Sequence, residues 1–377
     1  MRDYFGKDQR FYFRFPLDGD CLNCYDGDET EEGLRIVVRI AAPSGIQLTV
    51  NQQTAEWDGE CYTCPVILKN YRTTLEAVDT TTGESTAIVV YRLRDAVGKY
   101  RLSSDDNILF LQDLNDHPEY NSIFDNPYLA VYKKAHDLYG ACVHMNIYYE
   151  YGPEEMKDFS AHKKPFDLSM MTDRYKNEWQ QNAHWLRLSF HARKNYPDAP
   201  YRNSSIEEIS GDIERVHREI LRFAGEGVLS PVTTLHFGAA NLQVTRTLRE
   251  YGYRCLTGYF ELDKHGEPLV AYHYPADFVC HVGERDFWKD NQEDLIFCRI
   301  DRVLNYPQDA AENIKALEEV AENDHRAGFI SMMIHEEYFY PDYCNHRPRF
   351  EELVLEACRW CYERGYRGAL LSDTVFE

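Results

Sequence analysis

The chain of 377 residues carries a formal net charge of −22, and 44% of its residues are hydrophobic. This composition can supply the core of one large domain or of two smaller ones. The negative charge should repel phosphate backbones and anionic lipid surfaces, so we expect neither nucleic acid nor a membrane as a partner. No apolar run approaches the roughly 18 residues that a membrane helix needs.

The first residues, MRDYFGKDQRFYFRF, lack the continuous apolar stretch and the small-residue cleavage site of a secretory signal. The 11 cysteines are odd in number and scattered, which is typical of reduced thiols. Both features predict a cytoplasmic protein. Two Cys-x-x-Cys pairs, Cys21 with Cys24 and Cys61 with Cys64, could hold a structural zinc, but their long separation favours incidental cysteines.

Residues 1–103 have the pattern of an all-β domain. Short segments rich in β-branched residues alternate with turn signals such as APSG, WDGE and TTTGES. Strands at this spacing predict a small, immunoglobulin-like β-sandwich. The expected strands lie at residues 34–42, 46–51, 64–70, 73–79 and 86–93.

From residue 104 onward, expected strands alternate with amphipathic helices. Gly140 and Gly225 end two of these helices, and Ser205 with Glu208 forms a capping box at the start of another. This alternation predicts a (β/α) barrel of about seven to eight parallel strands over residues 104–377, with a doubly wound sheet as the alternative. The expected strands cover residues 107–114, 141–150, 186–192, 232–238, 255–261, 294–304, 329–339 and 367–373.

In a barrel, functional side chains lie at the carboxyl ends of the strands, which closure of the sheet brings together. One polar residue at a strand end often does no more than cap a helix. Three histidines and several carboxylates at the same end predict a functional site. The strand-end residues are Asp113, Asn115, Asp116, Asn146, Tyr148, Glu150, His191, His236, Asp301, His335, Glu336, Glu337 and Asp373.

Two kinds of chemistry fit these residues. Imidazole nitrogens with a carboxylate suit zinc or another divalent metal. Two carboxylates without a metal could instead act as acid and base on a glycosidic bond, with Asp113, Asp301 and Glu336 as candidates. The histidines favour the metal, because glycosidase chemistry does not need them. Tyr201 and Tyr338 lie in loops after strands, where aromatic rings either stack on sugars or pack.

Three stretches resemble motifs of the polysaccharide deacetylase superfamily. ILFLQDLND is similar to its first motif, an aspartate pair at the end of strand one. SFHARKN is similar to its metal-binding motif of two histidines, and MMIHEEYFYPDY to the late strand that supplies a general-acid histidine. The resemblance covers about residues 104–377 and implies a βα-barrel that uses a divalent metal to remove acetyl groups from amino sugars. The N-terminal part resembles the β-sandwich modules of carbohydrate-active enzymes.

The resemblance also implies a set of metal ligands. Asp113 takes the ligand position of the first motif, and His191 takes that of the second. The second histidine of the latter motif is Asn195 in this chain, a poorer ligand, so His236 is the natural replacement. Zinc is the ion we expect.

The same resemblance implies the groups that move protons. Gln112 stands at the position of the catalytic aspartate and cannot act as a base, so Asp116 is the expected base. His335 is the expected acid, which protonates the leaving amine. We expect the substrate to contact Asn195, Tyr201, Asp301, Glu336 and Tyr338.

The leading hypothesis is therefore a metal-assisted hydrolase of the carbohydrate deacetylase type. A metal-free glycoside hydrolase that uses Asp113 with Glu336 or Asp301 is the first alternative, and a chelator should not inhibit it. A non-catalytic barrel that binds a glycan is the second alternative, and it should release neither acetate nor reducing ends.

Overall fold

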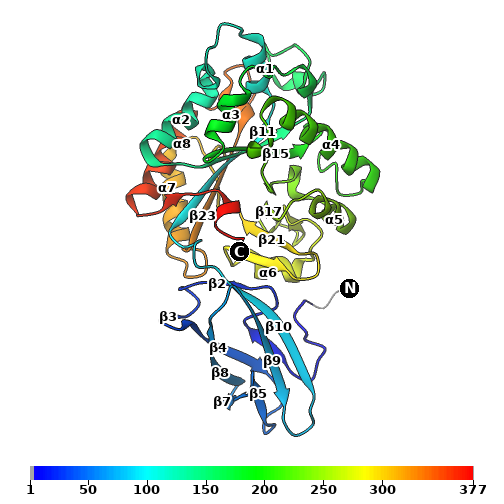
Figure 1. Cartoon of the computed structure of the whole chain (residues 1–377), viewed down its shortest axis with the longest axis vertical. Helices are drawn as coiled ribbons and strands as arrows, with labels where there is room; N and C mark the ends of the chain where they lie inside the picture. Colours follow the sequence, from blue (N-terminus) through cyan, green and yellow to red (C-terminus); the bar gives the residue numbers. More distant parts are fainter. Residues whose placement is uncertain (1–3, 377) are drawn as a thin grey trace.

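The computed structural model describes residues 4–376, and Figure 1 shows two parts that follow one another along the long axis. Sheets formed by residues 12–92 make up the lower part, and strands that alternate with helices make up the upper part. Within residues 4–376, every helix is too short or too polar to span a bilayer. The cytoplasmic location stays a prediction from the sequence.

Residues 12–92 form two five-stranded sheets. The strand orders are β1-β4-β8-β7, with β3 also paired to β4, and β2-β10-β9-β5-β6. In β4, the buried Leu34, Ile36, Val38 and Ile40 alternate with exposed residues, so one face of the strand supplies the core. These residues share one hydrophobic cluster with Val50 of the other sheet. The predicted strands are present, while the sandwich arrangement stays a prediction.

The strands of this part are β1 (Tyr12–Phe15), β2 (Cys21–Leu22), β3 (Asp28–Thr30), β4 (Gly33–Ala41), β5 (Leu48–Val50), β6 (Gln53–Thr54), β7 (Glu56–Trp57), β8 (Tyr62–Leu68), β9 (Arg72–Asp79) and β10 (Ser85–Arg92).

The upper part has a mixed α/β fold whose main strands are parallel. One sheet has the order β15-β12-β11-β23-β22, with β24 also paired to β11, and a second has the order β16-β17-β21-β20. All neighbours in these two sheets are parallel except β20 and β21. Because the hydrogen-bonded strands are divided between two sheets, the closed barrel of about seven to eight strands stays a prediction.

The strands of the two sheets are β11 (Lys99–Asn107), β12 (Val143–Tyr148), β15 (Leu186–Ala192), β16 (Val232–Thr233), β17 (Cys255–Gly258), β20 (Phe287–Asp290), β21 (Leu295–Arg299), β22 (Arg302–Val303), β23 (Phe329–His335) and β24 (Arg367–Gly368). Two small hairpins pair β13 (Glu150–Tyr151) with β14 (Phe166–Asp167) and β18 (Glu261–Leu262) with β19 (Pro268–Leu269).

Helices flank the parallel strands on both sides in Figure 1, with α2, α7 and α8 on one side and α4 and α5 on the other. The predicted capping box of α4 is present, because Ser205 and Glu208 bond reciprocally, and Gly140 ends α2 in a left-handed conformation. The helices are α1 (Leu109–Asp116), α2 (Pro127–Tyr139), α3 (Lys176–Asn182), α4 (Ile206–Phe223), α5 (Leu242–Glu250), α6 (Ala276–Gly283), α7 (Ala310–Ala321) and α8 (Phe350–Glu363). The short 3-10 helices are η1 (Ile123–Asp125), η2 (Glu155–Asp158), η3 (Leu168–Met170), η4 (Glu226–Val228), η5 (His236–Gly238), η6 (Glu336–Phe339) and η7 (Leu371–Asp373).

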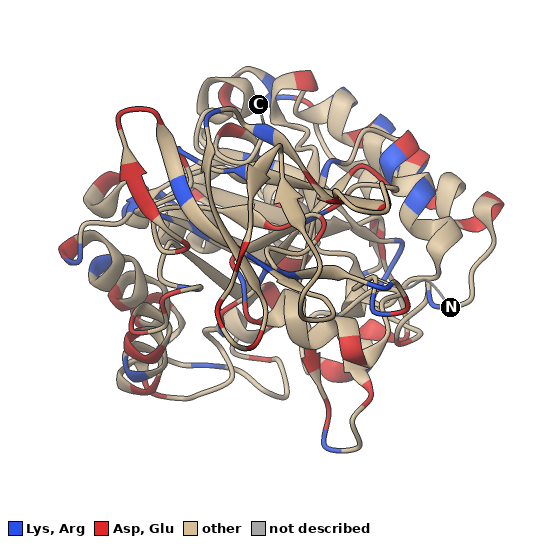
Figure 2. Ribbon diagram, turned by 90° about the horizontal axis from the view of Figure 1, so that it is seen from below, with Lys and Arg blue, Asp and Glu red and all other residues tan. Residues whose placement is uncertain are grey.

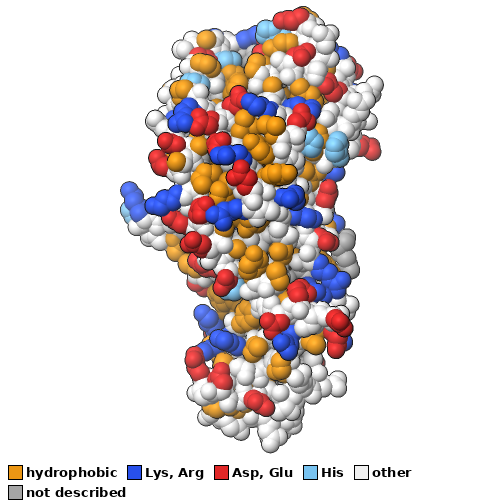
Figure 3. Space-filling view, turned by 90° about the vertical axis from the view of Figure 1, so that its left-hand side faces the viewer, with side chains coloured by type: hydrophobic (Ala, Val, Ile, Leu, Met, Phe, Trp, Pro, Cys, Tyr) orange, Lys and Arg blue, Asp and Glu red, His pale blue; other side chains and the backbone are white. Residues whose placement is uncertain are grey.

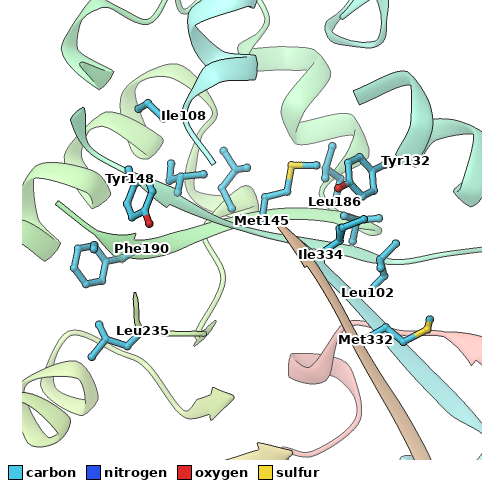
Figure 4. Packing of buried hydrophobic residues seen from close by; sticks show 14 of the residues in the cluster. Leu102, Ile108, Tyr132, Met145, Tyr148, Leu186, Phe190, Leu235, Met332 and Ile334 are labelled. Atoms are coloured by element: carbon cyan, nitrogen blue, oxygen red, sulfur yellow. The ribbon is translucent and has the colours of Figure 1, made fainter. Parts of the chain in front are cut away.

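The strands have one apolar face and one polar face. Leu102, Met145 and Ile334 belong to β11, β12 and β23 and pack in the main hydrophobic cluster, together with Tyr132 of α2 (Figure 4). On the other face of β11, the buried Arg101 donates to Ser331 Oγ and Thr234 Oγ1, at 3.2 and 3.5 Å. The same face carries Ser103 and Asp105, because side chains alternate along a strand. Polar groups of distant strands therefore meet inside the fold.

The first parallel strand lies earlier in the chain than the sequence predicts. Residues 107–114 are expected to form a strand, but Leu109–Asp116 form helix α1, and the strand is β11, which ends beside Asp105 and Asp106. A short apolar run cannot distinguish a strand from a buried helix. The predicted domain boundary at residue 103 consequently falls inside β11. At the other end of the chain, only Arg367–Gly368 of the predicted strand 367–373 is a strand.

The two parts are joined by an ionic contact. Asp20 is fully buried and accepts from His281 Nε2 of α6 at 2.7 Å, while Arg285 Nη2 donates to Asp26 at 2.7 Å. The backbone of Lys289 also donates to Gly19, at 2.8 Å. The N-terminal sheets are thus attached to the α6–β20 region.

Charged side chains of both signs are interspersed on the surface. Figure 2 shows Lys and Arg between Asp and Glu along the helices, and Figure 3 shows the same mixture on one side of the molecule. The net charge of −22 is therefore spread over the two views rather than gathered in one acidic field.

A distant glutamate caps helix α1. The backbone N–H groups of Ile108, Leu109 and Phe110 donate to the Glu336 carboxylate at 2.6, 3.0 and 2.5 Å. Tyr340 Oη also donates to this carboxylate, at 2.8 Å, and Glu336 is fully buried. The carboxylate satisfies N–H groups that have no partner within the helix.

Replacing Glu336 by Ala is expected to lower the free energy of unfolding by about 3 kcal/mol, because buried N–H donors lose their acceptor. Glu336→Gln keeps one acceptor oxygen and should cost less. Urea unfolding followed by circular dichroism measures both changes, and Glu56→Gln on the exposed strand β7 is the control. An alanine variant as stable as the control would contradict the capping role.

Candidate metal centre and active site

The main candidate site is a cavity of about 370 Å³ at the carboxyl ends of the parallel strands. Asp105 and Asp106 reach it from β11, His191 from β15, and His236 from the segment after β16. His335 and Glu337, at the end of β23 and after it, also line the cavity. Residues far apart in the sequence therefore meet where functional groups of parallel α/β folds usually lie.

Three side chains in this cavity form a compact cluster. Asp106 Oδ1 lies 3.0 Å from His191 Nε2 and 3.5 Å from His236 Nδ1, and the two imidazole nitrogens are 3.1 Å apart. Tetrahedral zinc with bonds of about 2.1 Å holds its ligand atoms about 3.4 Å from one another. The cluster thus has the spacing of three ligands around one small cation.

The hydrogen bonds on the far sides of the rings fix which nitrogens face the cluster. His191 Nδ1 bonds the carbonyl oxygen of Thr234, and His236 Nε2 bonds that of Asn195 at 2.8 Å. A carbonyl only accepts, so each of these nitrogens carries the proton. In the neutral form of each ring, His191 Nε2 and His236 Nδ1 therefore present lone pairs toward Asp106, and protonation of a ring would let it donate to this carboxylate. Backbone carbonyls orient metal-binding histidines in this way.

The surroundings of Asp106 favour a positive charge in the cluster. Burial alone would raise the pKa of Asp106, but hydrogen bonds with His191 and His236 hold it well below its usual range. Burial lowers the pKa of His191, yet the contact with Asp106 raises it overall. The backbone of Asp106 is left-handed, with φ 63°, which is rare for a residue other than glycine and often marks a functional site.

Tyr148 completes the support of the cluster. Its hydroxyl donates to Asp106 Oδ1 and lies 3.0 Å from His236 Nδ1 and 3.2 Å from Asn195 Oδ1. Burial, reinforced by the nearby charge of Asp106, raises the pKa of Tyr148 well above its usual value. The hydroxyl therefore keeps its proton and can orient the carboxylate.

These donors fit a divalent metal. One carboxylate oxygen and two imidazole nitrogens are the ligands of many catalytic zinc sites, which leave a further position open. Within residues 4–376, this is the one group of His, Cys, Asp and Glu whose donor atoms come together as metal ligands would. Among the described residues, Cys21, Cys24, Cys61 and Cys64 do not form such a group.

Three further polar groups face the cavity. Asp105 accepts from Asn146 Nδ2 at 2.5 Å, and His335 Nδ1 bonds Asn305 Oδ1 at 3.0 Å. Burial, with the charge of Asp106 as a further cause, raises the pKa of Glu337 well above its usual value. The raised pKa favours the protonated form of the Glu337 carboxyl group.

The structure does not bring Asp113 and Asp116 to the cavity. Both lie on α1, where Asp113 accepts from Asn126 Nδ2 at 2.7 Å and Asp116 pairs with Lys164 at 2.5 Å. The sequence predicted both aspartates at the end of a strand over residues 107–114, but Leu109–Asp116 form helix α1 instead. Asp105 and Asp106 occupy the strand end instead, and the consecutive aspartates after the polar stretch RLSS were the signal that could have located it.

The expected substrate-binding residues divide into two groups. Asn195 and Tyr338 line the cavity, and their contact with a substrate stays a prediction. Glu336 caps α1, and the Asp301 side chain is 3% exposed and accepts from Arg326 Nη2 at 3.1 Å. Tyr201 is buried with its hydroxyl 3.1 Å from Asp212, beside a different surface hollow. The structure does not bring these last three residues to the cavity, because their polar atoms are engaged in contacts within the fold.

No protein-family profile and no curated protein matches the chain. Among solved structures it is similar to a CE4 family pseudoenzyme from Bacillus anthracis, with 9% identity, a TM-score of 0.36 and coverage of 81% of this chain and 84% of that one. A second similar structure is a family 4 acetyl xylan esterase from Clostridium thermocellum in complex with a cobalt ion. Its identity is 12% and its TM-score 0.36, with coverage of 73% of this chain and 88% of that one. A third is a novel carbohydrate deacetylase, with 7% identity, a TM-score of 0.36 and coverage of 85% of this chain and 67% of that one. With these scores, the similarities carry no argument about activity.

Replacing His191 by Ala is expected to abolish binding of about one equivalent of zinc, because the cluster loses one of three donors. Asp113→Ala, on α1, should bind zinc as the wild type does. Elemental analysis of protein purified without an affinity tag, followed by zinc titration, compares the two. Zinc retained by the His191 variant, or lost by the Asp113 variant, would rule out this cluster.

Replacing Tyr148 by Phe is expected to weaken zinc binding about 10-fold or more, since outer groups that orient metal ligands have effects of this size. Competition with a chromogenic chelator gives the affinity. Tyr149→Phe, one residue further along the chain, is the matched control. Equal affinities for the two variants would show that the Tyr148 hydroxyl does not orient Asp106.

Proposed function

We propose that the chain is a metal-dependent hydrolase of the carbohydrate deacetylase type, which removes an acyl group from an amino sugar. The observation that carries this proposal is the Asp106–His191–His236 cluster, with both imidazoles oriented by backbone carbonyls. A divalent ion bound there would polarise the acyl carbonyl and lower the pKa of a water molecule. Zinc is the ion we propose.

The resemblance to the deacetylase superfamily supports the proposal once the strand end is corrected. The sequence SSDDN supplies the aspartate pair of the first motif, with Asp106 as the ligand and Asp105 as the base. Asn195 stands where the family has its second histidine, and it orients the replacement ligand His236 through its carbonyl oxygen. The departure at Asn195 is therefore compensated within the same cluster.

Proton transfer falls to residues on either side of the cluster. The Asp105 carboxylate, oriented by Asn146 Nδ2, is the group that accepts a proton from water. His335 bonds Asn305 Oδ1 through Nδ1, which leaves Nε2 to protonate the leaving amine. Asn195 and Tyr338 would contact the sugar.

We also propose the architecture in which this site is built. The two parallel sheets would be the halves of one barrel. They would be separated by two seams, where neighbouring strands of the two sheets are not joined by a ladder of backbone hydrogen bonds. A backbone hydrogen bond crosses each seam, from Ser230 N to Leu188 O at 2.9 Å and from Asp301 N to Ser331 O at 2.8 Å. The N-terminal sheets would be a β-sandwich accessory domain that ends before β11 begins at Lys99.

The proposal disfavours the glycosidase alternative, because Asp113, Asp301 and Glu336 do not meet in one cavity. A chelator is expected to stop amine release from N-acylated glucosamine, and added zinc should restore it. Full activity in the presence of the chelator would contradict the metal role. Sugar binding without release of any acyl group would favour the non-catalytic alternative.

Replacing His335 by Ala is expected to lower kcat about 100-fold or more, as loss of a general acid does, while the zinc content stays near one equivalent. Asp105→Asn should behave in the same way. Asp116→Asn, on α1, is the control and should leave kcat unchanged. Loss of zinc together with activity in the His335 variant would show that His335 acts on the metal rather than on the leaving group.

A further inference from the structure

The two sides of the main cavity differ in chemistry. Asp105, His191 and His236 come from β11, β15 and the segment after β16. The rest of the lining includes aliphatic residues next to aromatic ones such as Tyr259 and Tyr306. We call four of these aliphatic residues the aliphatic wall; they come from the segment after β16 and from the segments around β19, β21 and β23, and are Leu235, Val270, Ile300 and Met333.

The inner end of the aliphatic wall is a small apolar cluster of its own. Ile300 and Met333 pack with Val303, separately from the main core, and Tyr259 packs against them. Ile300 and Met333 are 2% and 3% exposed, so they form the deep part of the wall. At the outer end, Tyr259 Oη lies 3.2 Å from Tyr306 Oη, and the Tyr306 side chain is exposed.

The position of Val270 is set by close backbone packing. Its carbonyl oxygen accepts from Tyr259 N at 3.1 Å. A Cβ atom on Gly238 would lie 2.4 Å from Val270 Cγ1, and one on Gly258 would lie 2.3 Å from Val270 O, so neither position has room for a side chain. Val270 itself has φ 47°. Such strain persists where the surrounding structure enforces it, often at binding sites.

An exposed ring lies at the mouth of the cavity beside the ligand His236. Phe237 has φ 59°, is 47% exposed, and its ring centroid is 4.7 Å from that of His236. Leu269 and Tyr306 also line the cavity and are also exposed. The apolar surface therefore runs from the mouth to the deep cluster, past the candidate metal ligands.

We propose that the acyl group removed at this site is a straight chain longer than acetyl, which lies along the aliphatic wall. The inference rests on the proposed deacylase function. Aliphatic side chains offer no hydrogen bonds to sugar hydroxyl groups, whereas they bury methylene groups favourably. An acetyl group has a single methyl to place against the four residues of the wall.

The reaction is a hydrolysis of the amide. Water adds its oxygen to the acyl carbon, the C–N bond breaks, and the amine nitrogen takes a proton. The products are a carboxylate of the chain length of the acyl group and a free amino sugar, so no reactant other than water is consumed.

The test compares N-acetyl-, N-butyryl- and N-hexanoylglucosamine as substrates of the zinc-loaded full-length protein. Each buried CH₂ is worth about fourfold in kcat/KM, so the butyryl substrate, with two more CH₂ groups, should exceed the acetyl one by roughly 16-fold. A higher kcat/KM for the acetyl substrate overturns the chain-length proposal and leaves the deacylase function in place. Release of amine from none of the three substrates overturns the deacylase function itself, and the chain-length proposal with it.

Larger side chains in the aliphatic wall test where the acyl chain of the substrate lies. Met333→Phe and Ile300→Phe should each reverse the preference toward acetyl while the zinc content stays that of the wild type. Met170→Phe, at an exposed position of η3, is the size-matched control. An unchanged preference in both wall variants would overturn the placement.

A binding measurement gives the same comparison without turnover. In the His335→Ala protein loaded with zinc, calorimetry should show tighter binding of N-hexanoylglucosamine than of N-acetylglucosamine, and Met333→Phe added to it should remove the difference. Equal affinities for the two sugars before that second change would contradict the proposal.

Discussion

Three lone-pair donors that face one another in a buried space repel unless a positive charge lies between them. His191 Nε2, His236 Nδ1 and Asp106 Oδ1 are in this position, because backbone carbonyls hold the protons of both imidazoles on the far side. Neither ring can relieve the repulsion by a simple change of tautomer, since a buried carbonyl would then lose its donor. The candidate site, its chemistry and the proposals about it all depend on this constraint.

The fold supplies the constraint through the polar face of its strands. Arg101, Ser103 and Asp105 alternate with the apolar residues of β11, and Asn146 and Tyr148 lie on the adjacent strand β12. Helices pack on the apolar face of the strands, and burial of this face stabilises the sheet. The inner face therefore does not need apolar residues. The inner face is thereby free to carry hydrogen-bonding groups up to the strand ends.

The sequence predicted well what depends on periodicity and little of what depends on contacts between distant residues. Most strands and helices follow from alternation and from caps such as Ser205 with Glu208. His191 and His236 followed from their places at strand ends. β11 was missed because its inner residues are polar, and the apolar run beside it forms a helix, so Asp113 was chosen in place of Asp106.

The roles of single polar residues could be predicted least. Glu336 looks like a site residue in sequence, but its carboxylate accepts three N–H groups from a helix that begins more than 200 residues earlier. Tyr201 and Asp301 are likewise engaged by Asp212 and Arg326. No local pattern encodes such partners, because the partners meet only after the chain has folded.

The way His236 is held has a consequence for the order of assembly. Tyr272 N donates to Gly238 O at 2.6 Å, and Tyr272 Oη contacts Leu235 N, so the turn that carries His236 is fixed by residues about 35 positions further along the chain. Asp106 and His191 can meet as soon as β11, β12 and β15 have paired. His236, the third candidate ligand, is held in this way only after the chain has been synthesised beyond Tyr272. Tight binding of an ion would therefore be a late event in folding, which requires a folded protein and does not initiate folding.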